Sequence, residues 1–249
     1  MILLDEFISL NVSTEFLSLF LVVVQLGAIL AVPVLFWERL NPFSRKKQSA
    51  ERRKAFCVWG RVAVGAMPAA ILGLLMDDYI DSHFFNFWVV AIALVLYGIV
   101  FIFVEKNKAD EKNSIKSIDE MTYIDALKIG VFQSLSLIPG TSRSGSTIIG
   151  GMLIGISREA SAEFSFFMAI PIMLGASLLK VIKFLISGFS ATADEMLLLL
   201  VGSVVSFIVS ILAIRFLMDY VKHNDFKPFG IYRIVLGFVV LIYFVIQVI

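Results

Sequence analysis

Six apolar segments of about 20 residues dominate this chain of 249 residues. An α-helix needs roughly 20 apolar residues to cross a hydrocarbon core about 30 Å thick. The segments run approximately from Phe16 to Phe36, Val58 to Met76, Phe84 to Val104, Glu163 to Ile186, Met196 to Leu217 and Phe229 to Val248. Hydrophobic residues make up 59% of the chain and charged residues 16%, whereas a soluble domain has roughly 45–50% and about 25%. We therefore predict an all-α integral membrane protein, which excludes a cytosolic enzyme and a secreted disulfide scaffold.

Charge and cysteine content narrow the function further. The formal net charge is +1, from 21 basic and 20 acidic residues, so no basic surface is available for a nucleic-acid partner. Cys57 is the only cysteine, which excludes an internal disulfide and a Cys-x-x-Cys metal site. His83 and His223 are far apart and are expected in loops, so we predict no histidine metal cluster and no required cofactor.

The distribution of Lys and Arg predicts how the chain crosses the membrane. Basic residues are concentrated in residues 37–57, 105–128 and 218–228, whereas residues 1–36, 77–83 and 187–195 contain none. This alternation predicts six crossings with both termini outside. It requires that the apolar but broken segment from Thr122 to Ser161 enters and leaves from the cytoplasmic side. Residues 107–120 are charged and are expected to form a solvated linker within a single polytopic domain.

A weak internal repeat divides the chain. Residues 1–32 align with 149–180 and match at Ser13/Ser161, Glu15/Glu163 and Gly27/Gly175, among others. Two unrelated membrane helices that share letters by chance are the alternative. The repeat predicts halves at about 1–106 and 121–249 of inverted topology, with a site near the midplane where broken helices meet. The broken segment precedes the second copy, and its counterpart would precede Met1, so we expect the first re-entrant segment to be missing.

The broken segment contains the motif best suited to chemistry. Five hydroxyl residues and two glycines surround Arg143: Gly140, Thr141, Ser142, Ser144, Gly145, Ser146 and Thr147. Glycines let backbone N–H groups approach an anion, and a helix starting near Ser144 would direct its positive end toward it. The Arg143 guanidinium adds a planar donor suited to phosphoryl oxygens. The sequence thus predicts a phosphate-binding site; a Ser/Gly-rich cytoplasmic loop is the alternative, and the motif does not separate phosphate transfer from transport.

Other polar residues are candidates for supporting roles. Gln25, Gln133 and Glu163 are expected to support the site. Gln25 is expected to make an interhelical hydrogen bond, and Glu163 to lie at the start of its helix and complement the helix dipole. Gly27, Ala28, Gly175 and Ala176 suit close helix packing. Ser157, Arg158 and residues 163–166 are placed behind the motif, and Tyr232 and Arg233 are interpreted as interfacial anchors.

These motifs resemble those of the bacterial undecaprenyl-diphosphate phosphatase family, the bacitracin-resistance proteins. The resemblance is carried by Pro139–Thr147, Gly150-Gly-Met, Ser157-Arg, Glu163-Phe-Ser-Phe and Ala169-Ile-Pro, and by Gln25–Val32, Met67-Pro-Ala, Met121-Thr-Tyr and Phe229–Arg233. It covers essentially the whole chain. It implies hydrolysis of the C55 polyprenyl diphosphate to the monophosphate at the outer face of the plasma membrane. That reaction recycles the carrier lipid for peptidoglycan synthesis, supports cell wall biogenesis and cell shape, and counters bacitracin.

The family resemblance also implies what to expect of the site. Arg143 and Ser142 would act at the reacting phosphate, with the neighbouring hydroxyls and glycines as phosphate ligands and with Mg²⁺ or Ca²⁺ as a bridge between diphosphate oxygens. The family's N-terminal signature, a Glu-rich helix and a Pro-x-Ser-Ser-Thr-Gly-His loop, would end just before Met1. We therefore expect weak or no activity from residues 1–249 alone. A polyprenyl-phosphate transporter or flippase and an inert truncated paralogue are the alternatives, and a homodimer is compatible with the sequence.

Overall fold

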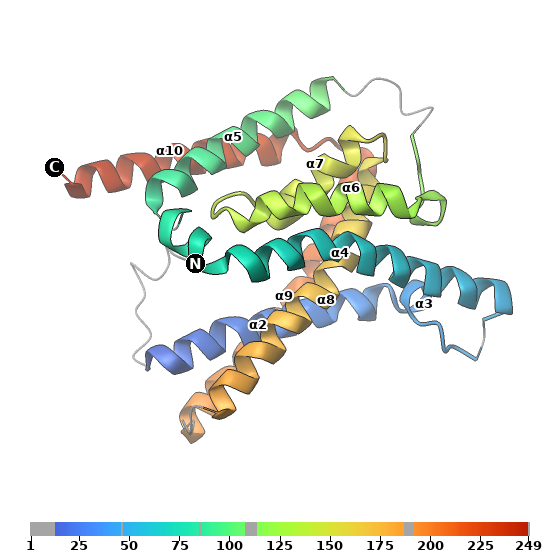
Figure 1. The fold of residues 1–249 in the computed structure, drawn as a ribbon, viewed down its shortest axis with the longest axis horizontal. Coiled ribbons are helices and arrows are strands. Elements are labelled where there is room, and N and C mark those ends of the chain that lie inside the picture. The colour runs from blue at the N-terminus through green and yellow to red at the C-terminus, as the bar shows by residue number, and fades with distance from the viewer. Residues whose placement is uncertain (1–12, 46, 85, 108–113, 187–191, 249) are drawn as a thin grey trace. The chain divides into compact units, whose positions relative to one another are not determined.

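The computed structural model describes residues 13–45, 47–84, 86–107, 114–186 and 192–248, and most of these residues lie in helices joined by short turns and loops (Figure 1). Two short 3-10 helices, η2 (Ile118–Glu120) and η3 (Leu135–Leu137), accompany the α-helices. The α-helices are α2 (Thr14–Leu35), α3 (Trp37–Leu40), α4 (Ser49–Phe84), α5 (Phe87–Lys106), α6 (Tyr123–Ser134), α7 (Arg143–Leu153), α8 (Arg158–Ile186), α9 (Ala193–His223) and α10 (Lys227–Val248). No strand occurs in the described ranges, which confirms the all-α prediction.

Five of these helices are long and apolar enough to cross a membrane, namely α4, α5, α8, α9 and α10. Helix α2 contributes a shorter apolar stretch, Leu19–Leu35. A multi-pass membrane protein follows from these lengths and compositions. Four predicted segments lie entirely within α4, α8, α9 and α10. The segment Phe16–Phe36 ends one residue beyond α2, and the segment Phe84–Val104 begins at the last residue of α4 and continues along α5.

The helices extend beyond the apolar segments. Helix α4 has 36 residues, or about 54 Å at 1.5 Å per residue, and continues through residues 77–83, where a loop was expected. His83 and His223 lie in the last turns of α4 and α9, so their placement in loops was wrong. Continuing a helix into water keeps its backbone hydrogen bonds, and hydropathy gives no sign of where that continuation stops.

The structure divides into two compact units, which are described separately. Unit 1 comprises Met1–Trp37 and Ala169–Arg215, and unit 2 comprises Glu38–Met168 and Phe216–Ile249. Both boundaries in the second half of the chain fall inside helices, α8 and α9. Each unit draws on both halves of the sequence, so the inverted repeat stays a prediction that the units do not test.

In unit 1, α2 packs closely against α9. A Cβ atom on Gly27 would overlap the backbone carbonyl of Ser203, which confirms the expected close packing at Gly27. The expectation was wrong for Gly175, because among the described residues a Cβ there would meet nothing within 4 Å. Gln25 is exposed on α2, and its expected interhelical hydrogen bond is not formed with any described residue.

In unit 2, glycines bring two pairs of helices into backbone contact. On α5 and α10, a Cβ on Gly98 would lie 2.6 Å from the Gly230 carbonyl oxygen, and a Cβ on Gly230 would lie 2.8 Å from that of Gly98. Helix α6 packs on α4 where Gly130 meets the Gly65 carbonyl. Farther along α4, Gly73 meets Leu137. The rising residue numbers show that α6 runs parallel to α4.

Part of the predicted linker is ordered and packed. Ile115 pairs with Ile156 in an isolated parallel bridge, through Ile115 N–H to the Gly155 carbonyl (3.0 Å) and Ser157 N–H to the Ile115 carbonyl (2.9 Å). Ile118 in η2 is fully buried. The expected solvated character is therefore wrong for Ile118, which is buried, and for Ile115, which is partly buried, whereas Lys116 between them is exposed.

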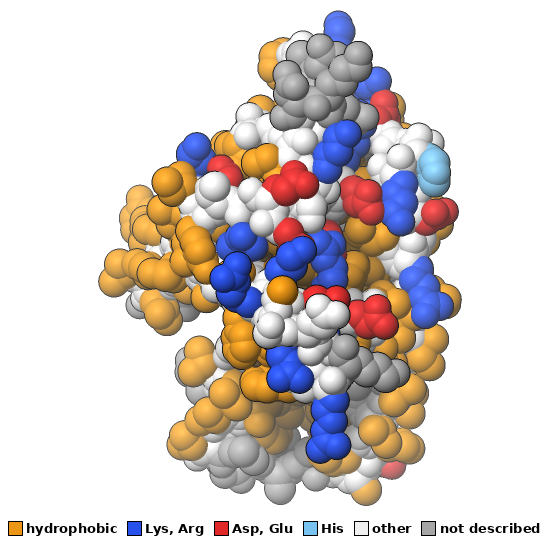
Figure 2. Space-filling view, turned by 90° about the vertical axis from the view of Figure 1, so that its right-hand side faces the viewer, with side chains coloured by type: hydrophobic (Ala, Val, Ile, Leu, Met, Phe, Trp, Pro, Cys, Tyr) orange, Lys and Arg blue, Asp and Glu red, His pale blue; other side chains and the backbone are white. Residues whose placement is uncertain are grey.

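Charged side chains gather on the face of unit 2 where α4 begins (Figure 2). Two ion pairs there are partly buried: Arg158 with Glu105 (2.7 Å) and Arg39 with Glu163 (2.5 Å). Glu105 also accepts from the Phe226 N–H (3.0 Å), so one carboxylate connects α5, the start of α8 and the turn before α10.

Candidate anion-binding site

The candidate site lies at the tip of a helical hairpin in unit 2. Helix α6 ends in η3, the chain turns at Pro139 and Gly140, and α7 returns beside α6 (Figure 1). Proline cannot continue a helix and bars the residue before it from helical geometry. Gly140 has φ of +91°, and a Cβ there would lie 2.6 Å from the Val90 carbonyl oxygen on α5. Only glycine suits this position. The break between two helices is observed, and its predicted re-entrant place in the membrane stays a prediction.

Helix α7 begins within the motif. Ser142 is the N-cap, and its hydroxyl accepts from the Gly145 N–H (3.1 Å), while the Ser146 N–H donates to the Ser142 carbonyl (2.9 Å). Arg143 is the first helical residue. The helix starts one residue before the expected position, and Arg143 therefore stands at the positive end of the helix dipole.

Three of the motif's hydroxyls are buried and point into the protein. Thr141 Oγ1 donates to the carbonyls of Leu135 (2.8 Å) and Ile138 (2.7 Å), which fixes the inner side of the turn. Ser146 Oγ donates to Tyr97 Oη (3.2 Å), and Thr147 Oγ1 to Ser165 Oγ (2.7 Å) on α8. The expectation that residues 163–166 lie behind the motif is confirmed for Ser165.

The remaining polar groups are more accessible. Ser142 is exposed, and Arg143 and Ser144 are partly exposed. A phosphate needs hydrogen-bond donors, and the hydroxyl protons of Thr141 and Thr147 are already donated to protein acceptors. The first turn of α7, with the side chains of Ser142, Arg143 and Ser144, is thus the part of the motif best placed to receive an anion. The ligand roles of Thr141, Gly145, Ser146 and Thr147 stay predictions.

The three supporting candidates lie in different surroundings. Gln133 on α6 is 1% exposed, and neither atom of its amide has a hydrogen-bond partner among the described residues. Glu163 is six residues into α8 and accepts from Arg39 Nη1 (2.5 and 2.6 Å), so its expected place at a helix start was wrong. Gln25 lies in unit 1, whereas the motif lies in unit 2.

Arg233 is a site residue that the sequence argument assigned elsewhere. Its Nη2 donates to the Gly140 carbonyl (2.6 Å), and its guanidinium lies 5.7 Å from the centre of the Tyr97 ring. The sequence argument did not predict this contact with the hairpin tip. The expected role of Arg233 and Tyr232 as interfacial anchors stays a prediction, and Tyr232 is 64% exposed. A cation six residues into an apolar segment is a signal that an ionisable group has a functional partner inside the protein.

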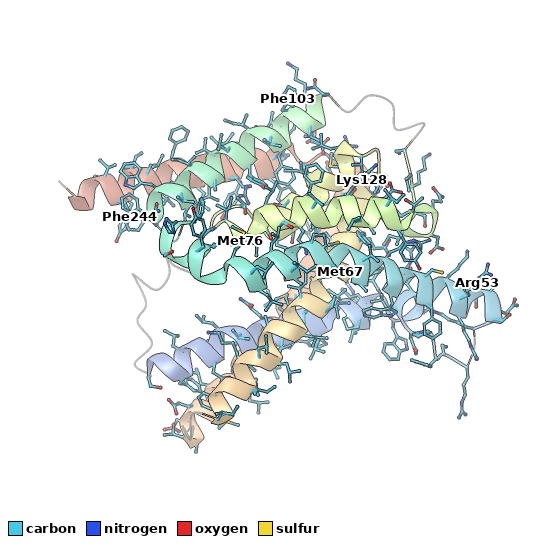
Figure 3. All side chains as sticks on the ribbon, in the orientation of Figure 1. Arg53, Met67, Met76, Phe103, Lys128 and Phe244 are labelled. Atoms are coloured by element: carbon cyan, nitrogen blue, oxygen red, sulfur yellow. The ribbon has the colours of Figure 1, made fainter. Side chains whose placement is uncertain are left out.

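The hairpin tip lies near one end of the neighbouring helices. Leu137 meets Gly73, close to the end of the apolar part of α4 at Met76, and Gly140 meets Val90 in the first turn of α5. In Figure 3, α4 runs from Arg53 past Met67 to Met76. The first turn of α7 instead packs farther along α5, where Ser146 contacts Tyr97 and Gly145 meets Phe101. The predicted position of the site at mid-membrane stays a prediction.

The donor set at the tip suits an anion. Hydroxyls, backbone N–H groups and a guanidinium donate hydrogen bonds, whereas Mg²⁺ and Ca²⁺ require oxygen acceptors, chiefly carboxylates. In the described ranges no group of three or more His, Cys, Asp or Glu side chains is arranged to hold a metal ion. The described residues at the tip therefore do not fit a protein-held divalent cation.

Comparison with known proteins assigns the family. The model of the bacitracin resistance protein BacA matches residues 1–239. The chain is 55% identical over 244 residues to "Undecaprenyl-diphosphatase 1" of Clostridioides difficile, covering 98% of this chain and 87% of the relative. It is 50% identical over 243 residues to "Undecaprenyl-diphosphatase" of Enterococcus faecalis, covering 98% and 88%. With half of its residues shared over nearly its full length, the chain belongs to the BacA family of bacitracin-resistance proteins.

Proposed function

We propose that this protein is an undecaprenyl-diphosphate phosphatase. The reaction transfers the terminal phosphoryl group to water, breaks the P–O bond of the anhydride, and yields undecaprenyl phosphate and inorganic phosphate. The observation that carries this proposal is Arg143 at the N-terminus of α7, beside the exposed hydroxyl of Ser142 at the tip of an apolar hairpin. The activity of the relatives supports the same substrate.

The described residues account for binding and for charge stabilisation. The first-turn N–H groups of α7 and the Arg143 guanidinium would bind the diphosphate and stabilise charge that spreads over the transferring phosphoryl oxygens. The Ser142 hydroxyl accepts from Gly145 N–H through a lone pair, so its proton is free to donate to a phosphoryl oxygen. Gly145 keeps the turn narrow, since a Cβ there would lie 3.2 Å from both Phe101 and Ser142.

The proposal includes the orientation of the protein. Six crossings, with both termini outside the bacterial plasma membrane, place the basic residues at the start of α4 in the cytoplasm. The α4–α5 turn then lies outside, and the hairpin tip lies near the outer surface. This arrangement is supported by the contact of Gly140 with Val90 and suits hydrolysis of a lipid head group at the outer face.

The inverted repeat and the weak activity of residues 1–249 stay predictions. The chain spans 87–89% of the length of the relatives it matches. The expected low rate refers to the isolated polypeptide of residues 1–249, compared with the Clostridioides difficile relative under the same conditions. A homodimer likewise stays a prediction, which the mass of the purified protein in nanodiscs would test.

The test measures binding and hydrolysis of undecaprenyl diphosphate by the purified chain in nanodiscs. We expect Arg143→Gln to lower hydrolysis about 100-fold or more, because removing one donor to a transition-state oxyanion costs roughly 10²–10³ in rate. We also expect weaker binding of the diphosphate. Arg53→Gln, at an exposed position on α4, is the matched control and should change neither quantity.

Each outcome has a defined meaning. Phosphate release that depends on Arg143 supports the proposal, whereas diphosphate binding that depends on Arg143 without phosphate release supports the anion site and contradicts hydrolysis by residues 1–249. Wild-type protein that does not bind the lipid diphosphate contradicts it. Movement of intact lipid phosphate across vesicle membranes without phosphate release would favour the transporter alternative.

A further inference from the structure

Arg233 is a partly buried cation in an apolar helix. It lies on α10 within the apolar segment Lys227–Ile246, and its side chain is partly buried. Removing a guanidinium from water is costly unless its N–H groups find acceptors. Its Nε atom is buried and has no hydrogen-bond partner among the described residues. The contacts that Arg233 does make therefore indicate why a cation is placed there.

Those contacts converge on the start of α7. Nη2 donates to the Gly140 carbonyl at 2.6 Å, a charge-assisted hydrogen bond. The guanidinium lies over the ring of Tyr97, and the hydroxyl of Tyr97 accepts from Ser146 in the first turn of α7. Arg233 and Tyr97 thus connect α10 and α5 to both sides of the helix N-terminus.

The Gly140 carbonyl belongs to the peptide unit that precedes Thr141. Its direction sets the path of the chain into Ser142, the N-cap, and so the direction of the first turn of α7. The hydroxyl of Thr141 anchors the inner side of this turn, and Arg233 anchors the other side through the carbonyl. Position 140 is a glycine with positive φ, and glycine has more backbone freedom than other residues. Without the hydrogen bond from Arg233, the turn could therefore adopt several conformations.

We propose that Arg233 is a positioning residue for the anion site, acting through the Gly140 carbonyl. It holds the N-terminal amides of α7 and the Arg143 side chain in the arrangement that binds the diphosphate. This inference rests on the proposed function and deepens it. Arg233 does not touch the phosphate, and its effect depends on donating a hydrogen bond.

The experiment measures the Kd of the full chain in nanodiscs for undecaprenyl diphosphate, well below the unfolding temperature of each variant. Arg233→Met keeps the length of the side chain and removes its donors. We expect Kd to rise about 10-fold or more, because a hydrogen bond to a charged group contributes roughly that factor. Arg233→Lys keeps a charged donor and should recover Kd to within about 3-fold of wild type. Tyr232→Phe, at the exposed neighbouring position, is the control and should match wild type.

The order of the Kd values across the variants distinguishes a positioning role of Arg233 from a general effect on stability. If Arg233→Met does not fold, the comparison uses wild type, Arg233→Lys and Arg233→Gln, whose donors weaken in that order, and Kd should rise in the same order. Equal Kd values across folded variants would overturn the positioning role while leaving the proposed function intact. A wild-type protein that fails to bind the diphosphate would instead overturn the proposed function.

Discussion

Arginine side chains fix both ends of the α6–α7 hairpin. At its base, Arg61 Nη2 donates to the Asp119 carbonyl (3.2 Å), and the guanidinium lies 5.8 Å from the centre of the Tyr123 ring. At its tip, Arg233 donates to the Gly140 carbonyl in the same way. Each arginine belongs to a long neighbouring helix, Arg61 to α4 and Arg233 to α10. The non-helical backbone at each end of the hairpin is therefore hydrogen-bonded to a regular helix.

The Glu105–Arg158 pair should be essential for stability. The Glu105 side chain is 1% exposed, and Glu105→Gln removes the charge that offsets the buried guanidinium. Breaking a buried pair by removing one partner costs about 3–5 kcal/mol, so we expect that loss in the free energy of unfolding, measured by denaturant titration in micelles.

The matched control is Glu159→Gln. Glu159 is 48% exposed and pairs with Lys222 at 3.7 Å, and an exposed pair contributes about 0–1 kcal/mol. Equal losses in the two variants would show that burial of the Glu105 pair has no special effect.

At the residue scale, the sequence located the motif but could not show which of its hydroxyl groups are buried and which are exposed. Thr141, Ser142 and Thr147 look alike in a Ser/Thr-rich run, yet one caps the helix and two are buried. Their side-chain directions follow from where Ser142 caps α7 and from contacts with α5 and α8, and neither is encoded in spacing alone. The contact of Arg233 with the hairpin tip could not be predicted, because its partner, the Gly140 carbonyl, is 93 residues away in the sequence.

At the element scale, the two glycines with positive φ offer a direct test of the hairpin tip. Gly140 and Gly155 both have φ of +91°, but a Cβ on Gly155 would meet nothing within 4 Å among the described residues. Gly155→Ala should therefore lose only about 1–2 kcal/mol of stability from backbone strain and should keep diphosphate affinity.

Gly140→Ala should lose both stability and affinity. Its Cβ would lie 2.6 Å from the Val90 carbonyl oxygen, so the tip must move away from α5 in addition to bearing the same strain. Unfolding curves and Kd for undecaprenyl diphosphate measure the two effects. A Gly140→Ala variant with the affinity of the Gly155→Ala variant would contradict the need for close contact between the tip and α5.

Hydropathy predicted which helices exist but not where they end. The apolar segments are largely helical, because about 20 apolar residues in lipid must satisfy their backbone internally. The extensions of α4 through Asp77–His83 and of α9 to His223 carry polar residues that suit either helix or loop. Local caps decide such boundaries, as Asn86 does for α5 by accepting from the Val89 N–H (3.0 Å).

At the scale of the whole molecule, the orientation can be tested without any assay of function. In a Cys57→Ser background, we expect Ser82→Cys to react with a membrane-impermeant maleimide on intact cells. Arg53→Cys should react only after permeabilisation, because it belongs to the basic end of α4. Both positions are exposed. The reverse pattern of labelling would show that the termini lie in the cytoplasm.

The large-scale organisation was only partly accessible from sequence. The unequal distribution of Lys and Arg between alternate loops can be recognised in the sequence, and it predicts how the chain inserts into the membrane. The grouping of helices depends on which glycines meet which backbones, such as Gly98 with Gly230 and Gly27 with Ser203. Those pairings join segments that are far apart in the sequence. As a result, each unit contains residues from both of the halves that the repeat predicted.

The proposed position of the hairpin tip near the outer face has an energetic consequence. Leu137 lies beside Gly73, about one helical turn from the end of the apolar part of α4. A polyprenyl diphosphate whose head group binds at the hairpin tip can keep its long isoprenoid chain in one leaflet throughout the reaction. Such a reaction moves no charge across the bilayer, so it should proceed with the membrane potential collapsed and without nucleotide fuel.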